Sequence, residues 1–336
     1  MNRIYRLCWN RKRAQWMVAS ELARRSGPTP TPRRIRAGRR LPALASLAWC
    51  LFAAGAAWAN PHGGHVTAGS GKVIQSGNTT VIDQTSQTLS LSWQSFDVGS
   101  QETVTFEQPN AGSLAINRIN SATGSEILGH IAANGQVWLI NPNGVLFGAG
   151  AQVDVGGLVA STLDAADHPG ASAQFSGTGH GSVVNQGTIT AASGGYVALL
   201  GHRVLNEGTI SAQLGTVALG AGSAQTLTFS GTHLVHLQVE KSTVDDLAAN
   251  GQLIEASGGH VIMTAGARDS LLATVVNNSG VVQAETVSSH GGTIDLLAGG
   301  PAGTVQVGGT LDAGAPHGGN GGSIETSAAH VTIAGT

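Results

Sequence analysis

The stretch Asn185-Gln186-Gly187-Thr188-Ile189-Thr190-Ala191 returns as Asn206-Glu207-Gly208-Thr209-Ile210-Ser211-Ala212, 21 residues further along the chain. Weaker copies occupy residues 250–256 and 278–284. A second segment, with glycine followed by aliphatic residues, trails the copies at residues 194–199, 214–219, 258–263 and 291–296. Repeats of about 20 residues that hold short strands and glycine corners are typical of one coil of a β-solenoid. The repeat therefore predicts an all-β protein built as a right-handed parallel β-helix.

The asparagine that opens each copy has a predicted structural role. Stacked coils would place one side-chain amide above the next, as in other stacked sheets, so we expect an amide ladder. Its members are Asn185, Asn206, Asn250 and Asn278. The alternative is a β-sandwich with glycine-rich turns. A sandwich would not need the same heptapeptide in register, which favours the solenoid.

Alternation of apolar and polar residues supports strands elsewhere in the chain. Between Val145 and Val155 the odd positions are apolar, whereas the even positions include Gln152 and Asp154. One apolar face and one polar face is what a half-buried strand requires. Residues 136–140 and 103–106 predict further strands.

Charge divides the chain near residue 59. Of the 17 Lys and Arg residues, 12 lie in residues 1–59, where Glu21 is the only acidic residue among 19. The remainder therefore has a formal charge of 5 − 18 = −13. So acidic a segment is not expected to bind nucleic acid or an anionic membrane through a basic patch. Both cysteines, Cys8 and Cys50, are in the first segment, which excludes disulfides and zinc–thiolate sites from the rest.

Residues 41–58 form an uncharged, mostly apolar run after a basic stretch, and the run ends at Ala57-Trp58-Ala59. A basic region, an apolar region and an A-x-A ending are the marks of a cleaved signal peptide. The alternative is a retained membrane anchor, because the run is just long enough to span a bilayer. We expect cleavage after Ala59, so that the mature chain begins at Asn60.

A tight turn is predicted at residues 141–144, within the stretch INPNGVLFG (140–148). Pro142 presets φ for the first central position, Asn143 tolerates the second, and Gly144 relieves the exit. Asn141 can cap the turn with its side chain. Taken alone, these residues indicate a good turn between two strands and no function.

Two regions resemble families of type V secretion. Residues 1–25 resemble the extended signal peptide of very large exported proteins of Gram-negative bacteria. Residues 93–162 resemble the filamentous-hemagglutinin-type secretion domain in order and spacing, and looser similarity extends over residues 60–310. The shared segments are WQSFDVG (93–99), VTFEQP (104–109), NRI (117–119), ILG (127–129), ANG (133–135), the turn at 141–144 and GAGAQVDVGGLVAST (148–162). Some members carry an additional NPNL turn, which this sequence lacks.

The resemblance implies a β-helix with an N-terminal cap that carries a secretion address. Its partner would be a dedicated outer-membrane transporter with periplasmic polypeptide-transport-associated domains. Recognition would require extended backbone that can add to a sheet edge of the transporter, and the acidic chain could meet a basic groove there. Candidate recognition residues are Asn117, Asn141, Pro142, Asn143 and Gly144. The competing interpretation is that these residues only shape turns.

No cofactor or metal is expected, and no enzymatic activity. The 12 histidines are dispersed, and the pair His62 and His65 fits a flexible terminus better than a ligand pair. The remote enzyme alternative is a β-helix polysaccharide lyase. Such an enzyme would need clustered carboxylates and a basic catalytic group. The adjacent acidic pair Asp245-Asp246 fits a solvated loop better than such a cluster.

The sequence thus predicts three parts: an extended signal peptide (1–59), a two-partner secretion domain (60–310) and the truncated start of further β-helix repeats (311–336). The chain ends inside what resembles a repeat, which favours the front of a longer exoprotein or adhesin. The N-terminal part of a hemolysin or of a contact-dependent growth inhibition toxin is the alternative. We expect the general secretory pathway to carry the chain across the inner membrane into the periplasm. From there we expect it to be secreted or displayed on the cell surface, where a host or neighbouring-cell surface would be a further partner.

Overall fold

The computed structural model describes residues 5–10, 15–20, 60–166, 169–244, 246–266 and 272–336. The chain divides into two units, Met1–Gly55 and Ala56–Thr336. In the first unit, β1 (Tyr5–Asn10) and β2 (Gln15–Ser20) pair as antiparallel strands. Within the described residues, no helix is long and apolar enough to cross a membrane.

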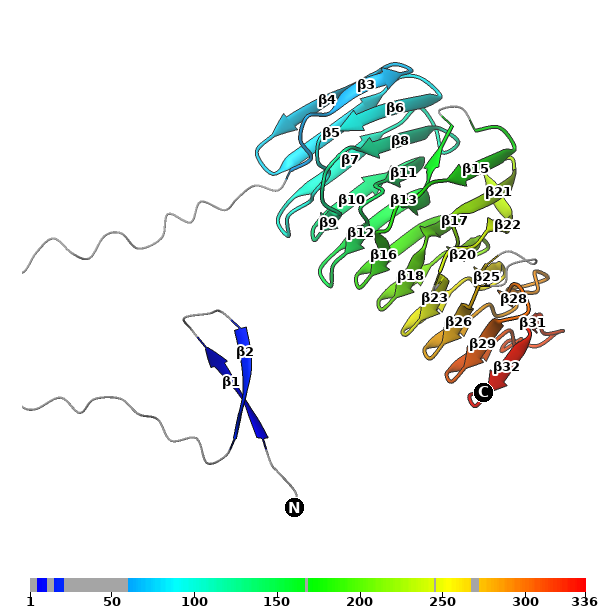
Figure 1. The fold of residues 1–336 in the computed structure, drawn as a ribbon. Helices are drawn as coiled ribbons and strands as arrows, with labels where there is room; N and C mark the ends of the chain where they lie inside the picture. The colour runs from blue at the N-terminus through cyan, green and yellow to red at the C-terminus, as the bar shows by residue number, and fades with distance from the viewer. Residues whose placement is uncertain (1–4, 11–14, 21–59, 167–168, 245, 267–271) are drawn as a thin grey trace, which may run out of the picture. The chain divides into compact units, whose positions relative to one another are not determined.

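The second unit is a stack of coils that supply strands to three sheets (Figure 1), of which the first two are continuous through β13 (Gln152–Ser161) and β17 (Thr188–Gly201). The first sheet contains β5 (Thr79–Gln84), β7 (Thr103–Glu107), β10 (His130–Ala133), the first parts of β13 and β17, β19 (Thr209–Ser211), β24 (Leu253–Glu255), β27 (Val281–Gln283) and β30 (Thr310–Asp312).

The second sheet contains β6 (Thr88–Trp93), β8 (Leu114–Ile119), β11 (Gln136–Ile140), the second parts of β13 and β17, β20 (Thr216–Ala221), β25 (His260–Ala265), β28 (Thr293–Ala298) and β31 (Ser323–Ser327). The third contains β9 (Ser125–Ile127), β12 (Val145–Phe147), β16 (Ser182–Asn185), β18 (Arg203–Asn206), β23 (Asp246–Asn250), β26 (Thr274–Asn278), β29 (Gly303–Val307) and β32 (His330–Ile333).

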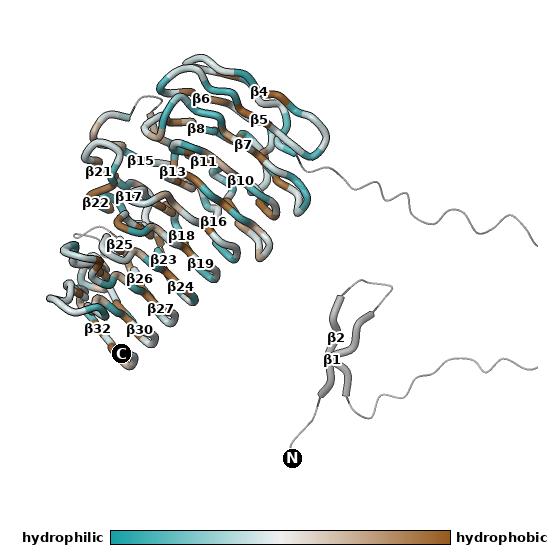
Figure 2. Tube along the Cα trace, turned by 180° about the vertical axis from the view of Figure 1, so that it is seen from behind, coloured by the Kyte–Doolittle hydropathy of each residue, from teal (hydrophilic) through white to brown (hydrophobic). Residues whose placement is uncertain are grey.

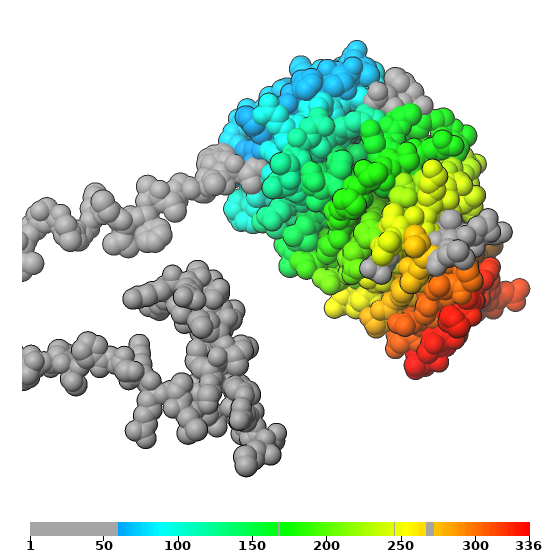
Figure 3. All heavy atoms as spheres, viewed as in Figure 1, coloured from blue at the N-terminus to red at the C-terminus, as the bar shows by residue number. Residues whose placement is uncertain are grey.

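Every strand in these lists pairs in parallel with its counterpart in the neighbouring coil. The parallel β-helix predicted from the repeat is therefore confirmed, and the two-sheet sandwich is excluded. In Figure 3 the colours follow sequence order along the stack, so each coil lies against the coils next to it in sequence.

Two antiparallel strand pairs form the expected N-terminal cap. The strand β3 (His65–Ala68) pairs with β6, and β4 (Gly71–Ser76) pairs with β5, both antiparallel. The first parallel strands of the helix thus have covered edges. An uncovered row of backbone donors and acceptors would be a template for aggregation.

The core follows the predicted alternation within β12 and β13, but the prediction is wrong at Ala149, which is exposed because the chain turns between these two strands. Val145, Phe147, Val153 and Val155 are buried inside the coils, whereas the side chain of Asp154 faces solvent. Apolar segments recur along successive strands of the stack (Figure 2). Ile189 and Ile210, from the two clearest repeats, are paired in register and fully buried.

The asparagine ladder is also confirmed. Each side-chain Nδ2 donates to the Oδ1 of the next member, from Asn185 to Asn206, to Asn250 and to Asn278, at 2.8 Å in all three steps. All four residues are at most 1% exposed. Buried amides are stable only when their donors and acceptors are satisfied, so the ladder favours this one register of the coils.

A fourth, antiparallel sheet lies outside the helix and was not anticipated from the sequence. It is built from two excursions of the chain, β14 (Asp164–Ala165) with β15 (Ser172–Ser176), and β21 (Ala224–Ser230) with β22 (His233–Lys241). Its apolar face packs on the outer face of the second sheet and forms a second core that includes Trp138, Phe175, Tyr196, Leu227 and Leu237. This explains why β11 and β20 are buried on both faces.

Tyr196 lies at the centre of this second core and is fully buried. Its hydroxyl donates to Gln136 Oε1 at 2.8 Å and accepts from Trp138 Nε1 at 3.0 Å. Burial raises the pKa of the Tyr196 phenol far above its usual range, although the hydrogen bond from Trp138 acts in the opposite direction.

This burial predicts a pH effect on the mature chain, in which Tyr196 is the sole tyrosine if cleavage occurs after Ala59. Above about pH 10 the phenol ionises only in the unfolded chain, so the free energy of unfolding should fall by about 1.4 kcal/mol per pH unit. Tyr196→Phe should abolish this slope, although it lowers stability at neutral pH because Trp138 loses its acceptor. Urea unfolding from pH 8 to 12 measures both effects. An unchanged slope in the variant would contradict the assignment.

Candidate functional site

The predicted turn at residues 141–144 connects β11 to β12 at a corner of the helix. Gly144 N donates to Asn141 O at 3.0 Å, which closes the turn, and Asn143 N donates to Asn141 Oδ1 at 3.0 Å. Asn141 is fully buried, and its Nδ2 donates to Thr123 O at 3.2 Å and to Ser125 Oγ at 3.1 Å. Its side chain therefore holds the turn to the chain segment of the preceding coil.

Gly144 fits its position for two reasons. Its φ is +114°, a region that residues with a Cβ rarely adopt. A Cβ built there would also lie 2.9 Å from Ser182 O in the following coil. The glycine is thus required by the stacking of coils as well as by the turn itself.

Pro142 and Asn143 are the exposed residues of the turn. Asn143 Nδ2 donates to Ser121 O at 2.7 Å, again toward the preceding coil, and Pro142 O accepts from Gly181 N of the following coil at 3.3 Å. The turn is therefore held from both sides, with two side chains presented to solvent at a fixed place.

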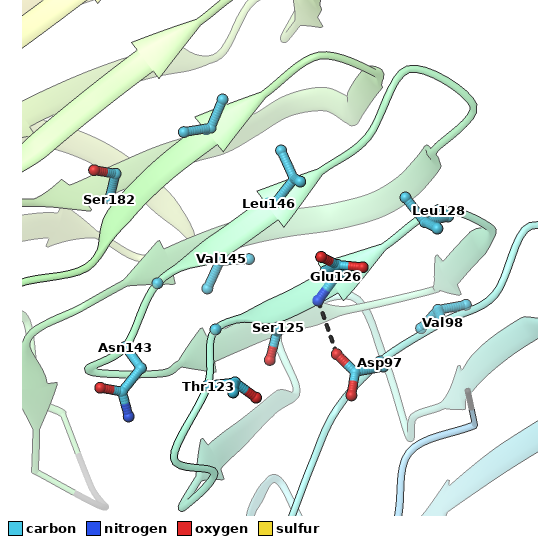
Figure 4. Close-up of a pocket in the computed structure, with 13 residues that line it drawn as sticks. Asp97, Val98, Thr123, Ser125, Glu126, Leu128, Asn143, Val145, Leu146 and Ser182 are labelled. Atoms are coloured by element: carbon cyan, nitrogen blue, oxygen red, sulfur yellow. Dashed lines mark hydrogen bonds between the residues drawn. The ribbon is translucent and has the colours of Figure 1, made fainter. Parts of the chain in front are cut away.

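A groove of about 600 Å³ begins at this turn (Figure 4). Its described lining residues are Asp97, Val98, Thr123, Gly124, Ser125, Glu126, Leu128, Asn143, Gly144, Val145, Leu146, Ser182 and Val184. Asp97 Oδ1 accepts a hydrogen bond from Glu126 N at 2.8 Å, so this carboxylate is fixed at the groove. Two carboxylates are among its described lining residues, beside apolar Leu128 and Leu146, and these residues include no lysine or arginine.

Asn117 does not belong to this groove. It lies in β8, fully buried, and its Oδ1 accepts from Trp93 Nε1 at 3.0 Å while its Nδ2 donates to Trp138 O at 3.2 Å. These bonds join three successive coils. A partner could touch Asn117 only if these coils opened.

The remaining candidates fall outside any common site. Ala57 and Ala59 of the expected cleavage site lie outside the described residues, and Asn60 is the first residue of the described body, where its Nδ2 donates to Gly77 O at 2.9 Å. The expectation of a solvated loop at Asp245-Asp246 is wrong for Asp246, which is 1% exposed. Asp246 is the first residue of β23. Its carboxylate accepts a hydrogen bond from Thr243 N at 2.7 Å and lies 3.1 Å from His202 Nδ1. Across the described ranges, no group of three His, Cys, Asp or Glu residues could hold a metal ion.

Sequence reasoning found the turn but missed Asp97, Glu126 and the residues Ser121 and Thr123 that anchor the turn. Ser121, Thr123 and Glu126 precede the turn by one coil and Asp97 precedes it by two, and no repeat in this region marks the coil length. The stretch NSATGS (120–125), rich in turn residues, was the available signal.

Two family models match this chain: the TPS secretion domain over residues 57–311, and the Extended Signal Peptide of Type V secretion system over residues 1–50. The chain belongs to the TPS secretion-domain family. The resemblances to two-partner secretion and to the extended signal peptide are therefore confirmed, and the protein is a TPS secretion domain of a two-partner secreted exoprotein.

Two curated relatives are both named heme/hemopexin-binding protein, from Haemophilus influenzae. One is 35% identical over 253 residues, covering 71% of this chain and 27% of the relative. The other is 32% identical over 243 residues, covering 65% and 26%. This TPS chain thus spans about a quarter of the length of the relatives that it matches. Among solved structures, the HMW1 secretion domain from Haemophilus influenzae matches with a TM-score of 0.63 and 29% identity, covering 76% of this chain and 70% of that one.

The different roles within the turn lead to a test of stability. Asn141→Ala should lower the free energy of unfolding by about 1–3 kcal/mol, because it leaves buried groups without partners. Asn143→Ala, at the exposed position, should change it by about 0.5 kcal/mol or less. Urea unfolding of the two variants measures the difference. Equal losses would contradict the division of the turn into a buried anchor and an exposed tip.

Proposed function

We propose that residues 60–310 are the address by which a cognate outer-membrane transporter with periplasmic polypeptide-transport-associated domains selects this exoprotein. Residues 1–59, cleaved after Ala59, would first direct the chain through the general secretory pathway to the periplasm. Residues 311–336 would begin the further repeats of the exoprotein. The observation that carries the proposal is the family match over residues 57–311. The role is one of recognition and delivery, without catalysis or a cofactor.

The contact surface that we propose is the exposed tip of the turn together with the acidic groove beside it. Pro142 and Asn143 are presented by a turn that is bonded to the preceding and the following coil. Asp97 and Glu126 give the adjoining groove a negative charge that a basic patch of the transporter would complement. Asn141, Gly144 and Asn117 would act indirectly, since they position the turn and the coils below it.

A secretion assay with the cognate transporter tests this surface. Asp97→Asn combined with Glu126→Gln should reduce the exoprotein in the medium several-fold and increase it in the periplasm, since complementary charge guides association. The amide oxygen that Asp97→Asn introduces can still accept the hydrogen bond from the backbone N–H of residue 126. The control, Glu107→Gln with Glu207→Gln, removes the same charge from exposed positions elsewhere. Normal secretion after both the groove charges and residues 141–144 are scrambled would end the proposal.

We further propose that the coils after the turn at residues 141–144 fold one by one as a β-helix at the cell surface, and that this folding biases movement outward without nucleotide. Coils contact chiefly their neighbours, so an emerged coil can template the next. The in-register pair of Ile189 and Ile210 inside the stack supports this order.

A matched pair of charge substitutions tests this step. Ile189→Asp places an unpaired charge in the core and should strongly reduce the amount released to the medium. Thr190→Asp, one residue further and facing outward, should leave release close to that of the original chain. The proportion of exoprotein in medium, membrane and periplasm is measured by immunoblot. Normal release of Ile189→Asp would contradict folding as the driving step.

For the complete exoprotein we propose a binding role, because both curated relatives are named for binding heme/hemopexin. The likeness favours this over the hemolysin and toxin-delivery alternatives. The test is whether the complete secreted exoprotein captures hemopexin. The same assay on this chain alone is the comparison, because it shows whether binding needs the rest of the exoprotein. Lysis of erythrocytes without such capture would favour the hemolysin instead.

A further inference from the structure

The outer antiparallel sheet ends at β22, which has β21 on one side and no strand on the other among the described residues. Register shifts interrupt the β21–β22 pairing at both ends of β22. Between them, residues 236–239 pair regularly with residues 225–228. A regular stretch of edge strand presents a row of backbone donors and acceptors, and proteins usually blunt or cover such an edge.

A groove of about 780 Å³ runs along this stretch, between β22 and the strands β25, β28 and β31 of the second sheet. Its lining includes His236, Leu237, Gln238 and Val239 of β22. Leu237 is buried in the second core and Val239 is also buried, whereas His236 and Gln238 are exposed. The free edge of the β22 backbone lies on this side of the outer sheet, because β21 pairs with the other edge. Figure 1 shows β22, β25, β28 and β31 following one another on one side of the stack.

The opposite wall is acidic with an apolar strip. Asp295 on β28 and Glu325 on β31 are paired in register and both line the groove, beside Leu297, Ala298 and Ala328. Asp295 is held in place by His260, whose Nε2 lies 2.7 Å from Asp295 Oδ2. No lysine or arginine is among the described lining residues. The groove shares no lining residue with the groove at residues 141–144.

We propose that this groove binds an extended, lysine- or arginine-bearing segment of a partner protein, which adds to β22 as a fifth strand of the outer sheet. Strand addition draws affinity from backbone hydrogen bonds and specificity from alternate side chains. The side chains that point toward the helix would meet Asp295 and Glu325, which selects for positive charge. This interaction is separate from secretion, because it uses different residues of the folded chain.

A binding experiment on the mature chain uses a short synthetic peptide of alternating lysine and valine. Hydrogen exchange should slow at residues 236–239 when the peptide is added. The same peptide with every backbone nitrogen methylated keeps its charge but has no backbone donor along either edge, and should bind about tenfold more weakly or worse.

Protein variants separate the groove from the overall negative charge. The double variant Asp295→Asn with Glu325→Gln should weaken binding about tenfold. If the double variant fails to fold, Glu325→Gln alone should weaken binding about threefold. Glu107→Gln with Glu207→Gln should have no comparable effect. Equal binding of the methylated peptide, equal weakening by the control variant, or no protection at residues 236–239 would each overturn the proposal. Protection that grows with protein concentration in the absence of peptide would overturn it in favour of a second copy of this chain.

Discussion

The register between neighbouring coils is the constraint on which the rest of this structure depends. Parallel pairing aligns Ile189 with Ile210 and Asn185 with Asn206, so a shift of one residue would move apolar side chains to the surface. The buried amide ladder adds a chemical reason, because a displaced coil would leave amide groups unsatisfied. The corners, the turn at residues 141–144 and the outer sheet all take their positions from this alignment.

The same register fixes the position of the turn that we propose as part of the address. Asn141 is bonded to the coil before it, and Gly144 is packed against the coil after it. Pro142 and Asn143 are therefore fixed relative to Asp97 and Glu126, although these residues are distant in sequence. A recognition surface assembled from three coils exists only when the coils are stacked. If this surface is the address, as we propose, selection of the chain requires the N-terminal coils to have stacked.

The sequence predicted those features that repeat. The heptapeptides at 185–191 and 206–212 are sufficient for the stacked coils and the amide ladder, because identical neighbours must share identical environments. The outer sheet could not be predicted, since it depends on long-range packing of Phe175 and Leu237 over Trp138 and Tyr196. The acidic groove was missed because its carboxylates, Asp97 and Glu126, come from two successive coils without a repeat. Asp246 was misjudged because its burial depends on packing against His202, which is distant in sequence and approaches only in the folded chain.

Pairs of introduced cysteines test the central alignment most directly, because residues 60–336 contain none. Thr188 and Thr209 are neighbours across the first sheet, whereas Asp312 lies several coils further along it. A short thiol cross-linker should join Thr188→Cys to Thr209→Cys within one secreted molecule. It should fail to join Thr188→Cys to Asp312→Cys. Equal cross-linking of both pairs, or none for the first pair, would contradict a continuous β-helix in the secreted protein.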